Sequence, residues 1–429
     1  MLAMLFRGLV LAMAALPLAA QSPDSGLAQR LREHLSQYLL KLPNYTCVQT
    51  TERWRRGLED CPQCERMDRV RLEIAVINGR EMFGYPGSAG FGQFDPVKLL
   101  QGGVAGRGDF ANGLVAILRA GPSALSLAGE DSRQNRRLLR YSYHVPATEK
   151  PFEFGTLDDK VSLGIHGDLW IDPRTLDLVR MEIVAENVPE RFHVSSLTSV
   201  IDYRPVQIAT SEFLLPGETE WLVVYSPIAQ ERRPDDPAWG VEYSRNAQVR
   251  NQTSYSQCRA YVAESSLRFD ADAEVPTPLA GAAAAPSALS ALPTGLSFSA
   301  KLQTAVDLRL SAAGDSVVAK VTKPAAQSGR VIVPEGAEIL GRIVNLEARA
   351  LTDQYGRLSW HSFLGIRFTA LRIGTTETPL AGRLSGARLP GNRCSAQTHK
   401  ENPEGLSIVC VGRPDAPLPA GLTFDWRTK

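Results

Sequence analysis

Two cysteines separated by two residues form the sharpest chemical motif in the chain. Cys61 and Cys64 enclose Pro62-Gln63, and such a pair can be a disulfide across a turn, a redox couple or half of a zinc site. Redox chemistry needs a stabilised thiolate, but the flanking segment is acidic. Zinc would need two more ligands, and the first 270 residues hold no second close pair of Cys or His. We therefore favour a structural disulfide and keep a thiol–disulfide oxidoreductase as an alternative.

The other residue types that carry chemistry are not spaced as known catalytic sets. No histidine has the His-x-x-x-His or His-Glu-x-x-His spacing of a zinc site, and no Gly-x-Ser-x-Gly elbow occurs. Residues 102–108 are glycine-rich but lack the Lys-Ser/Thr of a phosphate loop, and Asp158–Asp159 is typical of a solvated turn. An arginine cluster predicts a solvated hairpin, or else a site for an acidic partner or lipid headgroup: Arg133, Arg136, Arg137 and Arg140. We expect no catalytic, cofactor-binding or metal-binding residue.

The first twenty residues have the pattern of a secretory signal peptide. Arg7 is their only charge, an apolar run follows, and small residues end the segment at Ala19–Ala20. The apolar run is shorter than the about 20 residues that a membrane-spanning helix needs. No cysteine stands at the junction to carry a lipid. We expect cleavage after Ala20, no transmembrane segment in the mature chain, and a periplasmic or secreted location.

An even number of cysteines in an exported chain favours disulfides. Four of the six cysteines precede residue 260, and two lie near the C-terminus. If two domains fold separately, the last two must pair with each other, as Cys394–Cys410. In the first domain we prefer Cys61–Cys64 together with Cys47–Cys258, because the second of these would tie the first strand to the last.

Composition predicts an ordinary globular protein with two domains. The chain has 429 residues, of which 44% are hydrophobic and 22% charged, and its net charge is +1. No basic block interleaved with aromatic residues indicates nucleic-acid binding. Residues 271–292 are rich in Ala, Pro and Ser, which is typical of an extended linker. We therefore predict a domain at 21–270, this linker, and a domain at 293–429.

The pattern before the linker predicts an α+β fold. Leucines recur at helical spacing from Leu27 to Leu42, and a second helix is expected near 110–118. Apolar and charged residues alternate at 69–76 and 179–183, as in strands of a sheet with one wet face. Further strands are expected at 137–146, 160–166, 192–204 and 255–269. The apolar face of this antiparallel sheet must be covered by the helices or by a ligand.

The segment after the linker predicts short strands with frequent turns. Apolar runs separated by Gly, Pro and Asp occur at 316–322, 329–333, 337–345, 361–373 and 378–384. This spacing predicts a small all-β barrel or sandwich.

Segment 169–183, LWIDPRTLDLVRMEI, resembles the Trp-Ile-Asp-Pro hairpin of the LolA-like lipoprotein-carrier family. Together with the Leu27–Leu42 helix and the strand meander, it makes the first domain similar to that fold. The resemblance implies a half-barrel sheet with covering helices, and a lipid or lipidated protein as partner. Segments 42–54 and 258–269 also resemble a group of uncharacterised secreted proteins from soil bacteria.

Three segments of the second domain carry another resemblance: LPTGLSFSAKLQTAV (292–306), AGDSVVAKVTKP (313–324) and GRVIVPEGAEILGRI (329–343). They are similar to the β-barrel of TrbI-like conjugative-transfer proteins, which implies a barrel module here. The sequence departs from that family in lacking a membrane anchor and in its last residues, 370–429.

These patterns together predict a non-enzymatic exported protein of a bacterial envelope. The first domain is expected to bind an apolar ligand or a lipidated partner, because the LolA-like pattern is present and no catalytic set is. The alternative is a scaffold or assembly factor of a cell-envelope complex, with an envelope protein as its partner. No cofactor is expected.

Overall fold

The computed structural model describes residues 23–56, 65–87, 91, 112–133, 135–156, 159–226, 247–261, 292–307, 309–352, 358–388, 394–398, 405–411 and 421–429. Several predicted features lie outside these ranges: the export signal, the Cys61–Cys64 motif, the glycine-rich segment, Asp158 and residues 271–291 of the linker. Within the described ranges, no helix is long and apolar enough to cross a membrane.

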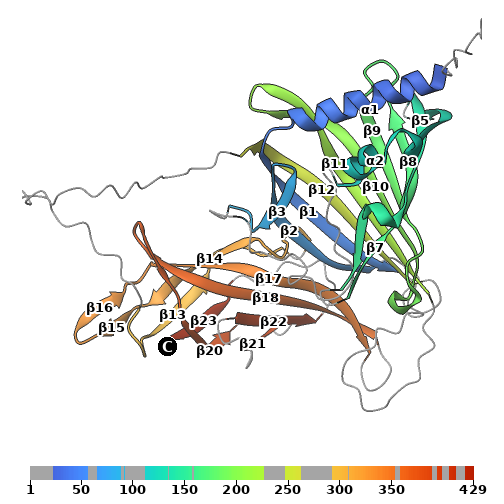
Figure 1. Ribbon diagram of the computed structural model, residues 1–429. Coiled ribbons are helices and arrows are strands. Elements are labelled where there is room, and N and C mark those ends of the chain that lie inside the picture. Colours follow the sequence, from blue (N-terminus) through green and yellow to red (C-terminus); the bar gives the residue numbers. More distant parts are fainter. Residues whose placement is uncertain are drawn as a thin grey trace, which may run out of the picture.

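The described N-terminal strands form a curled antiparallel sheet, here called the half-barrel (Figure 1). Hydrogen-bonded neighbours follow the order β3-β2-β1-β12-β11-β10-β9-β8-β5-β4. The strands are β1 (Tyr45–Arg56), β2 (Glu65–Ile77), β3 (Arg80–Gly84), β4 (Leu125–Arg133), β5 (Arg136–Val145), β8 (Ile165–Ile171), β9 (Leu178–Ala185), β10 (Val194–Ile208), β11 (Ser211–Tyr225) and β12 (Gln248–Ala260). A separate hairpin is formed by β6 (Phe152–Gly155) and β7 (Lys160–Leu163).

Side-chain alternation gives the half-barrel two different faces. In β11, Thr219, Trp221 and Val223 are buried, whereas Glu218 and Glu220 are not. Successive side chains of a strand point to opposite faces of the sheet, so one face gathers the buried set. This is the face that the helices cover, and we call it the inner face. The polar set forms the outer face.

Two α-helices are present among the described residues, α1 (Pro23–Lys41) and α2 (Asn112–Arg119), together with 3-10 turns at Pro122–Ala124, Ala147–Glu149 and Glu190–Phe192. Helix α1 corresponds to the helix predicted from leucine spacing. The predicted α+β fold class, with helices as a covering layer, is wrong because the described residues are mostly antiparallel strand. The physical reason is that two-residue alternation runs through most of the chain, so strands pair edge to edge and two helices cover only part of the sheet.

The C-terminal strands form a second curled sheet, here called the C-terminal barrel. Its order is β20-β23-β13-β14-β17-β18-β22-β21, with β19 also paired to β18, and β21 in turn contacts β20. The strands are β13 (Ser297–Leu302), β14 (Ser316–Lys323), β17 (Glu338–Thr352), β18 (Leu358–Ile373), β19 (Thr376–Pro379), β20 (Gly382–Arg388), β21 (Cys394–Thr398), β22 (Gly405–Val411) and β23 (Thr423–Thr428). The hairpin of β15 (Ala325–Gln327) and β16 (Arg330–Val333) projects from it (Figure 1).

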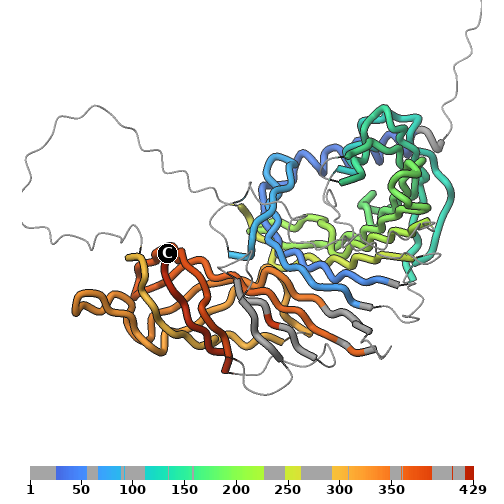
Figure 2. The backbone as a smooth tube through the Cα atoms, turned by 90° about the horizontal axis from the view of Figure 1, so that it is seen from below, coloured from blue at the N-terminus to red at the C-terminus, as the bar shows by residue number. Residues whose placement is uncertain are grey.

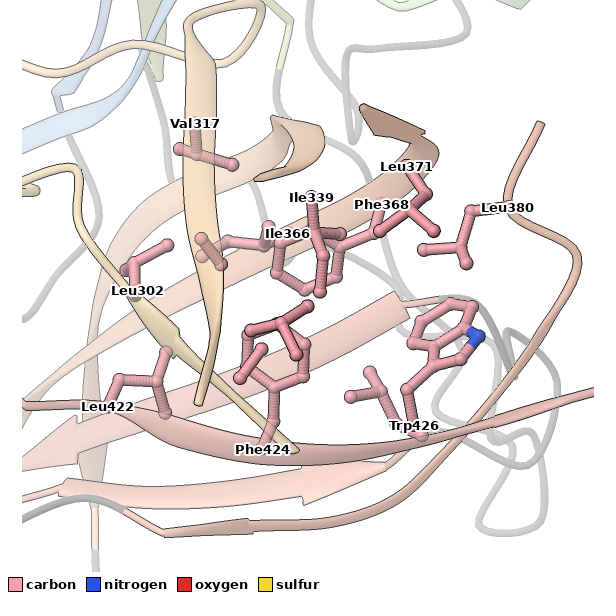
Figure 3. Packing of buried hydrophobic residues seen from close by; sticks show 14 of the residues in the cluster. Leu302, Val317, Ile339, Ile366, Phe368, Leu371, Leu380, Leu422, Phe424 and Trp426 are labelled. Carbon is pink, nitrogen blue, oxygen red and sulfur yellow. The ribbon is translucent and has the colours of Figure 1, made fainter. Parts of the chain in front are cut away.

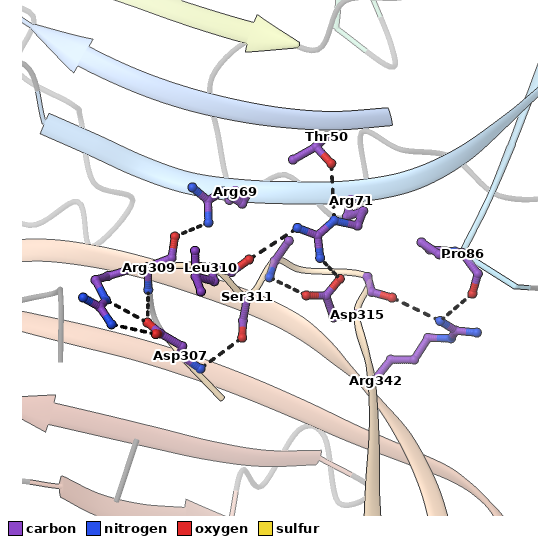
Figure 4. Close-up of polar contacts among 12 residues, drawn as sticks. Thr50, Arg69, Arg71, Pro86, Asp307, Arg309, Leu310, Ser311, Asp315 and Arg342 are labelled. Carbon is purple, nitrogen blue, oxygen red and sulfur yellow. Dashed lines mark hydrogen bonds and ion pairs between the residues drawn. The ribbon is translucent and has the colours of Figure 1, made fainter. Parts of the chain in front are cut away.

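The C-terminal barrel docks on the free edge of β2 (Figures 2 and 4). The Ala313 N–H donates to the Arg69 oxygen at 2.9 Å, and the Arg71 N–H donates to the Ala313 oxygen at 2.7 Å. The backbones approach so closely that a Cβ on Gly314 would collide with the Arg71 carbonyl oxygen. The Arg71 guanidinium also pairs with Asp315 at 2.6 Å. One sheet therefore continues through β2 from the half-barrel into the barrel.

Candidate ligand-binding site

A large apolar cluster lies on the inner face beneath the two helices. Leu31 and Leu35 of α1, with Leu114 and Ile117 of α2, are buried in it. The strands contribute Leu125, Leu139, Tyr141, Tyr143, Val145, Ile165, Leu169, Ile171, Leu178, Met181, Ile183 and Ile201. Burial of one such side chain contributes about 1.5–3 kcal/mol. The helices are therefore held by apolar surface that an acyl chain could also cover.

Arg32 of α1 connects the two helices. Its guanidinium donates to the backbone oxygen of Gly121 at 2.7 Å and to that of Leu118, both at the C-terminal end of α2. Carbonyls at a helix end have no partner within the helix, and the helix dipole favours a cation there. Desolvation lowers the pKa of Arg32. The side chain thus makes α1 and α2 one covering unit.

Two further contacts attach α1 to the sheet. His34 Nε2 lies 3.3 Å from Asp177 Oδ1 in the turn between β8 and β9. The Tyr38 hydroxyl donates to the Leu214 oxygen of β11, and burial raises the pKa of Tyr38. Helix α1 is therefore attached through three side chains, and its long axis runs across the end of the half-barrel (Figure 1).

The β6–β7 hairpin covers a second apolar cluster on the inner face. The Phe152 ring stacks on Trp221 at 5.5 Å between centroids, and Phe154 meets Phe192 edge-on at 5.3 Å. The buried members of this cluster are Val194, Leu197, Trp221, Val223, Tyr225, Ala247 and Val249. Phe152 also packs against the cluster beneath the helices. Small elements thus cover the inner face at two places.

A row of polar side chains, all buried except the half-buried Thr51, runs across the inner face. Strand register sets these side chains next to one another. On β10 and β11, Ser199 lies opposite Trp221, and Thr219 lies opposite Thr253 of β12. On β12, β1 and β2, the opposite pairs are Thr253 with Thr51, Asn251 with Arg53, and Arg53 with Asp68. We call this set the polar row: Ser199, Thr219, Asn251, Thr253, Thr51, Arg53 and Asp68. Apolar side chains are what the interior of a sheet normally holds, so each polar member needs a partner.

Most members of the polar row are partnered within the protein. Arg53, 1% exposed, forms a bidentate ion pair with Asp68, with Nε 2.6 Å from Oδ1. Thr51 Oγ1 lies 2.9 Å from Thr253 Oγ1. The hydroxyls of Ser199 and Thr219 are different, because they are buried and have no hydrogen-bond partner.

A disulfide joins Cys47 to Cys258, which is the pairing preferred from the sequence. It links β1 to β12 across a separation of 211 residues, beside the β-bulge at Thr46/Val48. The register of β21 and β22 places Cys394 opposite Cys410. The Cys394–Cys410 and Cys61–Cys64 disulfides remain predictions.

A pocket of about 330 Å³ opens on the outer face of the half-barrel, and polar side chains line it. They include Thr50, Glu52, Arg180, Asp202, Glu218 and Gln252. Arg180 is paired with Asp202 at 2.8 Å. The wall is more polar than apolar, so this pocket suits a polar partner better than an acyl chain.

The predicted arginine cluster lies on the exposed β4–β5 hairpin. Arg136 pairs with Asp172 at 2.8 Å, and Arg137 pairs with Glu130. Within the described ranges, no group of three or more His, Cys, Asp or Glu side chains is placed to hold a metal ion. Of the predicted Asp158–Asp159 turn, only Asp159 lies within the described residues, and it pairs with Arg191 at 2.7 Å.

Sequence reasoning missed the polar row and a contact on the outer face. His144 and His166 face each other across β5 and β8, and both contact Glu186, at 3.2 and 2.9 Å. A local signal for the polar row does exist: Thr219 occupies a position in the alternation that Trp221 and Val223 continue.

No family model matches the chain, and no curated protein matches it. A solved DUF1329 family protein from Desulfovibrio piger is 9% identical, with a TM-score of 0.28, over 56% of this chain and 95% of that one. A LolA superfamily protein from Nitrosomonas europaea is 12% identical, with a TM-score of 0.24, over 55% and 94%. A chain of the MucA/MucB complex of Pseudomonas aeruginosa is 12% identical, with a TM-score of 0.18, over 91% of this chain and 99% of that one. These scores are low, so no ligand or partner is transferred from those proteins, and the TrbI-like resemblance stays a prediction.

Proposed function

We propose that this chain is a non-enzymatic bacterial envelope protein whose half-barrel binds an apolar ligand or a lipidated partner on its inner face. The observation that carries the proposal is the composition of that face: two apolar clusters, each covered by a small element instead of a second sheet. A ligand with acyl chains can replace the covering side chains, since the hydrophobic effect is not directional.

The small number of polar contacts that attach α1 supports a helix that can move away from the inner face. Outside its apolar face, the helix is attached to α2 by the hydrogen bonds of Arg32 and to the sheet by one contact each of His34 and Tyr38. Each such contact contributes about 0.5–1.5 kcal/mol net, or somewhat more for the charged one. A ligand that binds beneath the helix gains enough apolar contact to offset their loss.

The Cys47–Cys258 disulfide supports a location outside the cytoplasm, because structural disulfides persist in oxidising compartments. The predicted export signal points to the same place. We therefore propose that the protein works in the periplasm or outside the cell.

Binding of a fluorescent fatty acid, 11-(dansylamino)undecanoic acid, tests this function. We expect its emission to rise and shift to shorter wavelength with the full-length mature protein. Arg32→Ala should speed association of the probe, because the two helices lose their connection. Arg30→Ala is the matched control, since Arg30 lies exposed on the same helix. If the wild type and Arg32→Ala both leave the emission unchanged, and protein purified from a periplasm carries no extractable lipid, the proposal is wrong.

A scaffold or assembly factor is the second candidate, and the outer-face pocket favours it. Its polar lining and open position suit a protein partner better than a lipid. A Glu218→Lys variant that still binds the fatty acid but loses an envelope protein in cross-linked pull-downs would support this role. Recovery of the same proteins with wild type and variant would count against it.

A further inference from the structure

Two hydroxyl groups on the inner face are buried without any hydrogen bond. Ser199 of β10 is 0% exposed and Thr219 of β11 is 3% exposed, and neither Oγ nor Oγ1 has a partner. Their neighbours in the polar row differ, since Thr51 and Thr253 satisfy each other. Leaving such a group unpaired costs about 1–3 kcal/mol, so its presence calls for an explanation.

The position of these hydroxyls relative to apolar surface suggests the explanation. Ser199 lies between Leu197, which belongs to the cluster under the β6–β7 hairpin, and Ile201, which belongs to the cluster under the helices. Thr219 is opposite Ile201 and is followed on the same face by Trp221. A ligand that reaches both clusters must therefore cross the two hydroxyls.

The charge of the polar row limits the group that can sit there. Arg53 is engaged by Asp68 on both sides of its guanidinium fork, so the row offers no uncompensated cation. A carboxylate or phosphate would be costly to bury beside it. A neutral acceptor suits two hydroxyl donors instead.

We propose that the ligand is an acyl lipid with a neutral ester or amide carbonyl between two apolar portions, and that Ser199 and Thr219 donate hydrogen bonds to this carbonyl. The inference rests on the proposed function and names its ligand class. The two apolar portions occupy the two clusters, and the carbonyl satisfies hydroxyls that the free protein leaves unpaired.

A matched pair of ligands tests the proposal. Octyl octanoate and heptadecane have chains of equal length and differ by a central ester. Their dissociation constants are measured by displacement of the dansyl fatty acid from the wild type and from the Ser199→Ala/Thr219→Val double variant. We expect the ratio of the two constants to shift by about tenfold against the ester in the variant, which corresponds to about 1.4 kcal/mol. Heptadecane should bind both proteins alike.

Controls separate this inference from the function beneath it. Thr198→Val removes a hydroxyl from the opposite face of β10 and should leave the ratio unchanged. Thermal melting checks that the double variant is folded, and its Tm should equal or exceed that of the wild type because no hydrogen bond is lost. An unchanged ratio with both ligands still bound overturns the ligand class alone. Failure of the wild type to bind either ligand overturns the proposed function as well.

Discussion

The two halves of the molecule bury their interiors in different ways. In the C-terminal barrel one cluster of apolar residues fills the interior, where Phe368 stacks on Phe424 at 4.6 Å and Trp426 meets Phe368 edge-on (Figure 3). Its described buried polar residues are the single positions Ser362, Thr378 and Thr428, and the Ser362 hydroxyl and the Trp426 indole N–H have no hydrogen-bond partner. In the half-barrel, three clusters are separate, and the polar row crosses the inner face between them.

This difference suggests that the two parts of the molecule have different roles, one in stability and the other in binding. A continuous apolar core stabilises a barrel through close packing of its side chains. A buried row with an ion pair and unpaired hydroxyls lowers stability relative to apolar residues, so it is better explained by binding than by folding. Under the proposed function, the half-barrel would carry the binding site and the barrel would support it.

The largest effect should follow from damage to the support. Phe424→Ala removes a ring that is 1% exposed and stacked in the barrel core, and we expect a loss of about 3–5 kcal/mol in the free energy of unfolding. Urea titration followed by circular dichroism measures it. Val331→Ala, at a position 55% exposed, is the control and should change stability by less than about 0.5 kcal/mol. A similar loss of unfolding free energy in the two variants would contradict the view that one apolar core stabilises the barrel.

The disulfide should matter somewhat less, and only for the half-barrel. Replacing Cys47 and Cys258 together by Ser removes a cross-link between residues 211 apart, which we expect to cost about 2–5 kcal/mol. Thermal melting without reductant gives the measurement. Fatty-acid binding should weaken as well, because the link holds β12 to β1 beside the polar row. A variant that melts like the wild type would show that this link adds no stability.

Parts of this comparison could be predicted from sequence and parts could not. The leucines of α1 and the 169–183 hairpin are local patterns, and both elements are present as α1 and as β8 with β9. The α+β prediction failed because helical spacing reveals a helix but not how much of a sheet it covers. Strand alternation likewise fixes which side chains share a face of one strand, but not which strands are neighbours.

The candidate site shows this limit most clearly. Thr51, Thr219 and Thr253 come from three strands that are far apart in sequence, and only register brings them together. Read singly, each is a threonine in a strand, which is ordinary. The preferred Cys47–Cys258 pairing is present because it was chosen to link the first strand of the domain to the last, and these strands are neighbours.

Acid should weaken the half-barrel through a buried carboxylate in the turn after β8. The Arg174 N–H donates to Asp172 at 2.9 Å and the Arg136 guanidinium binds it, so the pKa of Asp172 lies below its ordinary value of 3.8. The stabilisation is complete above the ordinary value and is lost as pH falls through the lower folded pKa. Hydrogen bonds to charged groups contribute about 1.5–3 kcal/mol. Asp172→Asn should flatten the acid limb of unfolding free energy against pH, and equal slopes for the two proteins would refute this role.

The smallest effect separates the two kinds of hydroxyl in the polar row. Thr253→Val breaks the bond to Thr51 and should lower the free energy of unfolding by about 1 kcal/mol. Thr219→Val, at the neighbouring position across β11 and β12, breaks no bond and should be neutral or stabilising in the ligand-free protein. Because both residues are buried threonines, 3% and 6% exposed, the difference between the two variants measures mainly the bond. If both variants lose the same stability, the Thr219 hydroxyl is satisfied in solution, and the contrast between the two kinds of hydroxyl disappears.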